Sequence, residues 1–203
     1  MTSFVKESEN AAYFVSQSLK AGGVAVVPTE TVYGLICDAC NSGAIQSVYA
    51  VKNRLLSKPL SLFVSNIEVI LDNAINLSSE QVEFVVNNMP GPVTVIVKMS
   101  ESCSFVKGLS ELVGVKSGQC RLIGFRIPQY EFCMQVLDYF KRPIVATSVN
   151  FSGESPAVKL RDIDQQIINH LTVCVGAKDE KCLSGKPSTV YDFTNSTSVI
   201  LRT

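Results

Sequence analysis

The residues best suited to chemistry are cations, hydroxyls and amides placed just after predicted helices and strands. Lys52, Arg54 and Lys58 fall within seven residues, at the predicted end of one helix and in the loop after it. Arginine and lysine together suit a triphosphate, arginine by bidentate contact and lysine as a point charge. The helix dipole also favours cations at a C-terminus. The cluster therefore predicts either a phosphate site or a solvated group that complements the dipole.

A polar turn precedes that helix. Residues 22–35 read G-G-V-A-V-V-P-T-E-T-V-Y-G-L, in which a short buried strand ends at Pro28, because proline has no N–H to continue a ladder. Hydroxyls and a carboxylate follow, among them Glu30 and Thr31. Open α/β sheets bind ligands in the crevice beyond their strand ends. The turn is thus either a plain loop or one wall of a site.

Two later strands carry polar groups of the same kind. Arg126 lies in the apolar stretch R-L-I-G-F-R-I-P, where a charge is costly unless it is paired. It either bridges to a buried carboxylate or faces a ligand. Ser148 and Asn150 follow a predicted strand over 144–146, as turn formers or as ligand contacts.

Composition limits the class of protein. A chain of 203 residues fits one domain over residues 1–203, able to bury roughly 70% of its unfolded surface. Basic and acidic residues balance at 18 each, which disfavours binding to nucleic acid through phosphate neutralisation, although a local patch stays possible. No apolar run approaches the ~20 residues of a membrane span. The chain has one histidine, so no Ser-His-Asp or Cys-His set is evident and no catalytic side chain is predicted.

The seven cysteines are an odd number, and the N-terminus M-T-S-F-V-K-E-S-E-N has no signal-peptide character. Both observations predict reduced thiols and a cytoplasmic location. Cys37 and Cys40 form a C-x-x-C, but no second pair follows, and two thiolates leave zinc short of its usual four ligands. We therefore predict structural thiols and no metal site.

Periodicity predicts alternating helices and strands. Helices are expected over 8–21, from 41 or 42 to the cationic cluster, over 67–71, 78–87 and 130–140, and near 163–168. Strands are expected over 24–27, 60–64, 93–98, around Arg126, and over 144–146 and 173–175. Residues 100–120 are rich in Ser and Gly and predict a surface excursion that could act as a lid.

Five motifs in order resemble the YrdC-like family: P-T-E-T-V-Y-G-L, K-N-R with S-K-P-L, P-G-P-V-T, S-V-N, and P-S-T-V-Y-D. The resemblance extends from about Gly22 to Arg202 and suggests a short, single-domain form. It implies an α/β fold with a twisted, mixed parallel and antiparallel sheet, flanking helices and a positively lined cleft. We take P-G-P-V-T as a turn entering the sheet and therefore as scaffold.

Characterised members of that family make threonylcarbamoyl-adenylate from L-threonine, bicarbonate and ATP. By resemblance, ATP would be bound by Lys52, Arg54, Lys58, Ser148, Asn150 and Arg202. Threonine or its carbamate would be bound by Thr31, Arg126, Ala146 and Ser188. Phe63 stands where many members have a histidine near the amino acid, and this changes one contact of that pocket.

The implied chemistry is adenylation, in which a carbamate oxygen attacks the α-phosphorus of ATP and expels pyrophosphate. Positioning and charge neutralisation serve such a transfer better than a covalent nucleophile. Mg²⁺ is expected with the nucleotide, and a tRNA-modifying threonylcarbamoyl transferase complex is the expected recipient of the product. Two alternatives remain: a non-catalytic module that binds double-stranded RNA, and a carbamoyl transferase-like domain.

Overall fold

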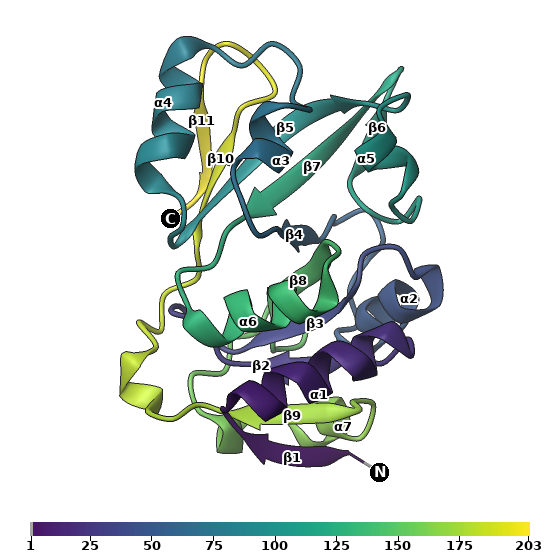
Figure 1. Cartoon of the computed structure of the whole chain (residues 1–203), viewed down its shortest axis with the longest axis vertical. Helices are drawn as coiled ribbons and strands as arrows, with labels where there is room; N and C mark the ends of the chain where they lie inside the picture. The colour runs from purple at the N-terminus through teal and green to yellow at the C-terminus, as the bar shows by residue number, and fades with distance from the viewer. Residues whose placement is uncertain (1) are drawn as a thin grey trace.

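The computed structural model describes residues 2–203, in which eleven strands form one mixed sheet (Figure 1). The strand order is β1-β9-β2-β3-β8-β4-β7-β5-β10-β11, and β6 pairs with β7. Strands β1/β9, β2/β9, β4/β7 and β5/β10 are parallel, whereas β2/β3, β3/β8, β4/β8, β5/β7, β6/β7 and β10/β11 are antiparallel. The predicted mixed sheet is confirmed.

The bounds of the elements are as follows. The helices are α1 (Glu9–Lys20), α2 (Ser42–Val51), α3 (Glu68–Leu71), α4 (Ser79–Asn88), α5 (Ser104–Lys107), α6 (Glu131–Phe140) and α7 (Gln165–Ile168), with short 3₁₀ turns η1 (Leu160–Asp162) and η2 (Glu180–Cys182). The strands are β1 (Ser3–Lys6), β2 (Ala25–Val27), β3 (Gly34–Asp38), β4 (Ser61–Phe63), β5 (Val93–Ser100), β6 (Val115–Ser117), β7 (Cys120–Arg126), β8 (Ile144–Ser148), β9 (Val173–Gly176), β10 (Thr189–Asp192) and β11 (Val199–Arg202).

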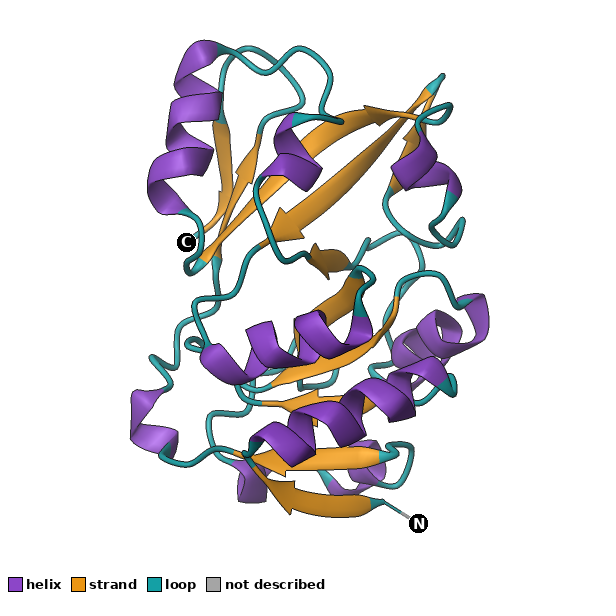
Figure 2. Ribbon diagram, viewed as in Figure 1, coloured by secondary structure: helices purple, strands orange, loops and turns teal. Residues whose placement is uncertain are grey.

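Helices α1 and α6 cover one face of the sheet from β9 to β8, and Figure 2 shows them running side by side. Helix α1 begins where the Ser8 side chain accepts a hydrogen bond from the N–H of Ala11. Its buried Val15 and Leu19 join Phe132 and Phe140 of α6 in one apolar cluster. Burial of these side chains stabilises the packing of α1 and α6 against this half of the sheet.

The other half, around β5, β7 and β10, is covered on one face only. At alternate positions of these strands, Val95, Val97, Ile123 and Phe125 are buried in the main core. The intervening residues point to the opposite face, as strand geometry requires. That opposite face becomes the wall of a cleft, described below.

Most sequence predictions of elements are confirmed. Helix α4 begins at a capping box in which Ser78 and Gln81 exchange hydrogen bonds. The structure adds elements that the sequence did not predict. Residues 100–120 contain α5 and β6, which pairs with β7 in a hairpin. The strands β1, β3, β10 and β11 were missed, and β8 continues to Ser148, two residues beyond its predicted end.

The connection from β9 to β10 runs along the edge of the molecule at the left of Figure 1, in yellow-green. The N–H groups of Ser184 and Gly185 donate to the carbonyls of Glu30 and Thr31 at 3.0 and 2.8 Å. Gly185 has a φ of 75°, which glycine adopts without strain. The T-E-T turn is therefore tied to the segment that leads into β10.

Within residues 2–203, none of the helices has the length and apolar character that crossing a membrane would need.

Candidate active site

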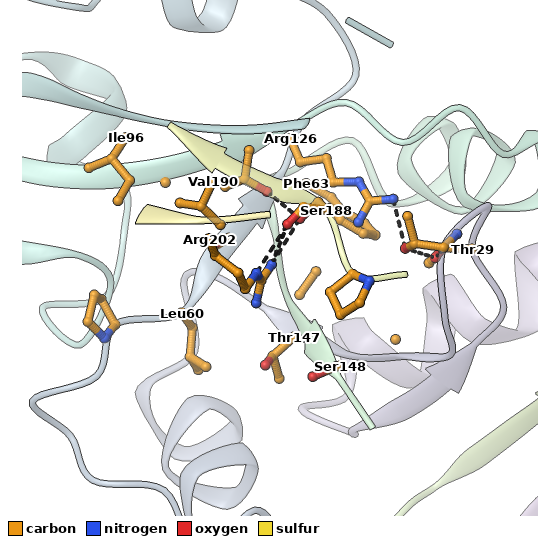
Figure 3. Close-up of a pocket in the computed structure, with 18 of the residues that line it drawn as sticks. Thr29, Leu60, Phe63, Ile96, Arg126, Thr147, Ser148, Ser188, Val190 and Arg202 are labelled. Carbon is orange, nitrogen blue, oxygen red and sulfur yellow. Dashed lines mark hydrogen bonds between the residues drawn. The ribbon is translucent and has the colours of Figure 1, made fainter. Parts of the chain in front are cut away.

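A cleft of about 350 Å³ opens where β4, β7 and β8 meet, next to β5 and β10 (Figure 3). It is lined by Thr29, Thr31, Val32, Tyr33, Gly34, Arg54, Pro59, Leu60, Ser61, Phe63, Thr94, Ile96, Val115, Leu122, Gly124, Arg126, Ala146, Thr147, Ser148, Pro187, Ser188, Val190, Asp192, Thr194 and Arg202. Three of these residues are arginines and many carry hydroxyls, so the lining suits an anionic, polar ligand.

Arg126 is bound at the end of β7 by the T-E-T turn. One of its terminal nitrogens lies 2.7 Å from Oε1 of Glu30 and 3.0 Å from Oγ1 of Thr31. The side chains of Arg126 and Glu30 are 8% and 16% exposed, so this ion pair is buried. The guanidinium carbon lies 5.6 Å from the centre of the Phe63 ring, on the neighbouring strand β4. The predicted pairing with a buried carboxylate is confirmed, and Arg126 also lines the cleft, where its contact with a ligand stays a prediction.

Two polar atoms of that pair are buried without a partner in the described part of the chain. Arg126 Nε and Glu30 Oε2 are buried, and neither has a hydrogen-bond partner within residues 2–203. A buried donor or acceptor without a partner costs free energy. A ligand in the cleft would meet the part of the guanidinium that is exposed, through a charge-assisted hydrogen bond.

The hydroxyls of Thr29 and Thr31 extend the Arg126 contact into a chain. Thr29 Oγ1 donates to the carbonyl of Val32 at 2.7 Å and lies 2.8 Å from Thr31 Oγ1. Because Thr29 has one hydroxyl proton, Thr31 must donate to it, and Thr31 in turn accepts from Arg126. This fixed order orients the Thr31 hydroxyl in the cleft wall.

Ser188, just before β10, links the second arginine to the cleft. Its carbonyl accepts from Nε and a terminal nitrogen of Arg202 at 3.1 and 2.8 Å, and its hydroxyl lies 2.9 Å from that of Thr94. Arg202 is on β11, which pairs with β10. These bonds hold the Arg202 guanidinium over the cleft, next to the chain end.

Arg54, the third arginine, is held by the loop after α2. Its Nε donates to the carbonyl of Lys58 at 2.9 Å, and a terminal nitrogen donates to the carbonyl of Pro59 at 3.0 Å. The Lys58 side chain itself is exposed and does not line the cleft. The loop thus positions Arg54 through its backbone.

Lys52 lies behind the cleft wall. It is 1% exposed, and its ammonium donates to the carbonyls of Ser148 and Asn150 and to Asn150 Oδ1. Asn150 Oδ1 also accepts from the Ser148 hydroxyl at 2.6 Å, and its Nδ2 donates to two carbonyls of the same loop. Lys52 and Asn150 therefore organise the S-V-N loop from behind, and only Ser148 of the three lines the cleft.

The three arginines raise the positive charge of the cleft. Burial lowers the pKa of Arg202, and the nearby charges of Arg126 and Arg54 lower it further. Among the cleft-lining residues of the described chain, Asp192 is the one carboxylate. An anion that enters would relieve the repulsion among the arginines.

Lys52 should make the stability of the protein depend on pH. Burial, with a smaller effect of Arg54, lowers the pKa of Lys52 to about 7, so the unfolded chain binds more protons above that pH. The free energy of unfolding should therefore rise with pH across this window, by about 2 kcal/mol between about pH 6.5 and 8.5. In Lys52→Met this contribution should be missing, as urea unfolding at both pH values would measure.

The wild-type ammonium can also be titrated directly by NMR of the Lys52 side chain, whether or not the methionine variant folds. A midpoint near 10 would contradict the expectation.

The described residues 2–203 contain no group of three or more His, Cys, Asp or Glu side chains placed to hold a metal ion. All seven cysteines are free, and burial raises the pKa of Cys37 and Cys40, which disfavours the thiolates that a metal needs.

Seven of the ten residues predicted to bind ligand line the cleft: Thr31, Arg54, Arg126, Ala146, Ser148, Ser188 and Arg202. Lys52, Lys58 and Asn150 do not. Sequence reasoning assigned no role to Glu30 and treated the P-G-P-V-T strand as scaffold, yet its Thr94 lies in the cleft wall. Alternation along that strand, with Thr94 between two valines, was the signal available.

Comparison with known proteins places this geometry in a family. A family profile described as "Telomere recombination", for the Sua5, YciO and YrdC proteins, matches residues 17–203. The chain belongs to the Sua5/YciO/YrdC family. The threonylcarbamoyl-AMP synthase of Vibrio campbellii is 30% identical over 190 residues, which are 93% of this chain and 96% of that protein.

Longer relatives carry the same region. The threonylcarbamoyl-AMP synthase of Mus musculus is 31% identical over 182 residues, 86% of this chain, and the match spans 60% of the mouse protein. A crystal structure of P. abyssi Sua5 complexed with L-threonine has a TM-score of 0.83 at 23% identity, covering 100% of this chain and 57% of that one. This likeness shows that the fold is shared.

Proposed function

We propose that the chain is an L-threonylcarbamoyladenylate synthase. L-threonine, bicarbonate and ATP would give threonylcarbamoyl-AMP, pyrophosphate and water. The threonine amine bonds to the bicarbonate carbon, and a carbamate oxygen then bonds to the α-phosphorus as the bond to pyrophosphate breaks. The names of the Vibrio and mouse relatives support this reaction, as does the threonine in the P. abyssi Sua5 structure.

The observation that carries the proposal is that one cleft presents guanidinium groups at two separate places. Arg126, which donates to Thr31, lies at one end, and Arg202 lies nearer the middle with Ser188 (Figure 3). A substrate with a carboxylate and a second with phosphates would each meet an arginine. Guanidinium geometry suits both anions.

In this proposal the amino acid binds at the Arg126 end. The Arg126 guanidinium receives its carboxylate, Thr31 and Ser188 contact the carbamate, and Ala146 leaves room beside them. Phe63 adds an apolar wall beneath the guanidinium. The amino acid is thereby held with its amine turned toward the nucleotide.

The phosphates of ATP bind between Arg54, Arg202 and Ser148. These donors would stabilise the negative charge that develops on the pyrophosphate as it leaves. Such electrostatic stabilisation is the main contribution of a protein to this kind of transfer. Lys52 and Asn150 contribute by fixing Ser148. Lys58, exposed at the loop, is available to the outer phosphates.

A protein-held Mg²⁺ does not fit the cleft, whose described lining has a single carboxylate. The expected Mg²⁺ belongs to the nucleotide substrate. The product would pass to a tRNA-modifying threonylcarbamoyl transferase complex. Weak binding to RNA and a cytoplasmic location stay predictions from the sequence.

Pyrophosphate release by the purified protein tests the proposal. With ATP and Mg²⁺, release should require both L-threonine and bicarbonate. Release with carbamoyl phosphate in place of threonine and bicarbonate would favour a carbamoyl transferase. No release from folded protein under any combination would contradict the synthase and favour the RNA-binding module.

A further inference from the structure

The end of the cleft away from Arg126 has a different character. In Figure 3, Leu60, Ile96 and Val190 gather at one end, Thr29 and Arg126 lie at the other, and Arg202 and Ser188 lie between them. The apolar end is therefore a separate compartment that begins where the phosphate-binding arginines end.

This compartment has a flat floor. Ile96, Leu122 and Val190 come from three adjacent strands and point to the same face. Gly124 lies beside them, and a side chain there would come within 3.1 Å of the Ser61 hydroxyl and 3.5 Å of the Thr94 methyl. A planar, largely apolar group can lie on such a surface.

Asp192 lies beside Ile96, its register partner on β5, at the β10 side of this floor. It follows Val190 on the same face of β10, roughly 7 Å further along the strand. Its Oδ1 accepts a hydrogen bond from the N–H of Thr194 at 2.8 Å. This bond fixes the carboxylate and leaves Oδ2 as an acceptor at the cleft edge.

We propose that Asp192 is a specificity-determining residue that selects adenine by accepting a hydrogen bond from its exocyclic amine. The inference rests on the proposed use of ATP. With the phosphates at Arg54 and Arg202, the base would lie on Ile96, Leu122 and Val190, and its edge would meet Asp192.

The group at the purine 6-position decides between the bases. Adenine carries an amine there, which can donate to the free Oδ2 of Asp192. Hypoxanthine and guanine place an oxygen at that position, and two acceptors face to face repel each other.

Comparing ATP with ITP isolates this contact, because inosine has an oxygen where adenosine has the amine. In the wild type, kcat/KM for pyrophosphate release should be at least about tenfold higher with ATP. Asp192→Asn keeps the Oδ1 bond to Thr194 and replaces the free oxygen with an N–H₂ donor. That donor opposes the adenine amine and suits the inosine oxygen, so the ATP-to-ITP ratio should fall by about tenfold or more.

Asp179→Asn is the matched control. Asp179 Oδ1 accepts from the N–H of Lys181 at 2.9 Å, in the same local pattern, but Asp179 is exposed and outside the cleft. Its ATP-to-ITP ratio should equal that of the wild type. Equal use of ATP and ITP by the wild type, or an equal loss with both nucleotides in Asp192→Asn, would overturn the inference.

Titration calorimetry with ATP and ITP separates this inference from the proposed function. Preferential ATP binding that is lost in Asp192→Asn supports base selection even in a protein that releases no pyrophosphate. Pyrophosphate release that depends on threonine and bicarbonate, with the same ratio in wild type and Asp192→Asn, keeps the synthase and rejects the role of Asp192.

Discussion

Replacing Arg126 with methionine should abolish threonine-dependent pyrophosphate release and also destabilise the fold. The change removes the guanidinium proposed to hold the amino-acid carboxylate. It also leaves Glu30, 16% exposed, as a buried carboxylate that has lost its ion pair. Breaking a buried pair on one side costs about 3 kcal/mol or more in the free energy of unfolding, which urea denaturation would measure.

A second substitution separates the two effects. Glu30→Gln added to Arg126→Met removes the uncompensated charge, so most of the lost stability should return while activity stays absent. Arg126→Lys keeps the charge without the planar fork and should raise KM for threonine more than it lowers kcat. Full activity in the stable double variant would show that Arg126 serves only to pair with Glu30.

Replacing Arg54 with alanine should lower kcat for pyrophosphate release by about 10²- to 10³-fold, the usual effect of losing one donor to transition-state charge. Arg54 is anchored by the carbonyls of Lys58 and Pro59, so it meets the phosphates without being reordered. Arg54→Lys should recover only part of the rate, because an ammonium cannot keep both anchoring bonds in the same geometry. Steady-state kinetics with saturating ATP would measure both.

Arg161→Ala is the control for that experiment. Arg161 is in η1, its side chain is 77% exposed, and it lies outside the cleft. Its loss should change neither kcat nor KM beyond error. If Arg54→Ala had the same kcat as Arg161→Ala, the proposed role of Arg54 at the phosphates would be rejected.

The sequence predicted the fold where local signals were strong. The Ser78–Gln81 capping box and the apolar stripes of α1 and α6 each lie in a short segment. The strand β3 was missed because it follows the T-E-T turn directly and its residues are buried throughout. Buried on all sides, it lacks the alternation that identifies a strand.

Sequence reasoning predicted which residues line the cleft better than it predicted how they are arranged. The resemblance to the YrdC-like family grouped Thr31, Arg126 and Ser188 in one site, but it could not tell whether a cation lies in the cleft or behind its wall. Lys52 and Arg54 are two residues apart, yet one is buried behind the S-V-N loop and the other lines the cleft. Such a division depends on contacts with residues almost one hundred positions away, which no local pattern contains.

The pairing of Arg126 with Glu30 shows the same limit. The sequence offered a buried ion pair and a ligand contact as alternatives for Arg126. In the structure the same side chain pairs with Glu30 and also lines the cleft. A guanidinium has five N–H donors, so a single pairing does not exhaust it.

The most direct measurement of the central claim is the fate of carbon from ¹³C-bicarbonate. The purified protein would be incubated with ATP, Mg²⁺, L-threonine and labelled bicarbonate, and the nucleotide products analysed by mass spectrometry. The account predicts an adenylate that contains threonine and one carbon from bicarbonate, formed in equal amount to pyrophosphate. An adenylate without the label, or AMP and pyrophosphate formed without threonine, would contradict it.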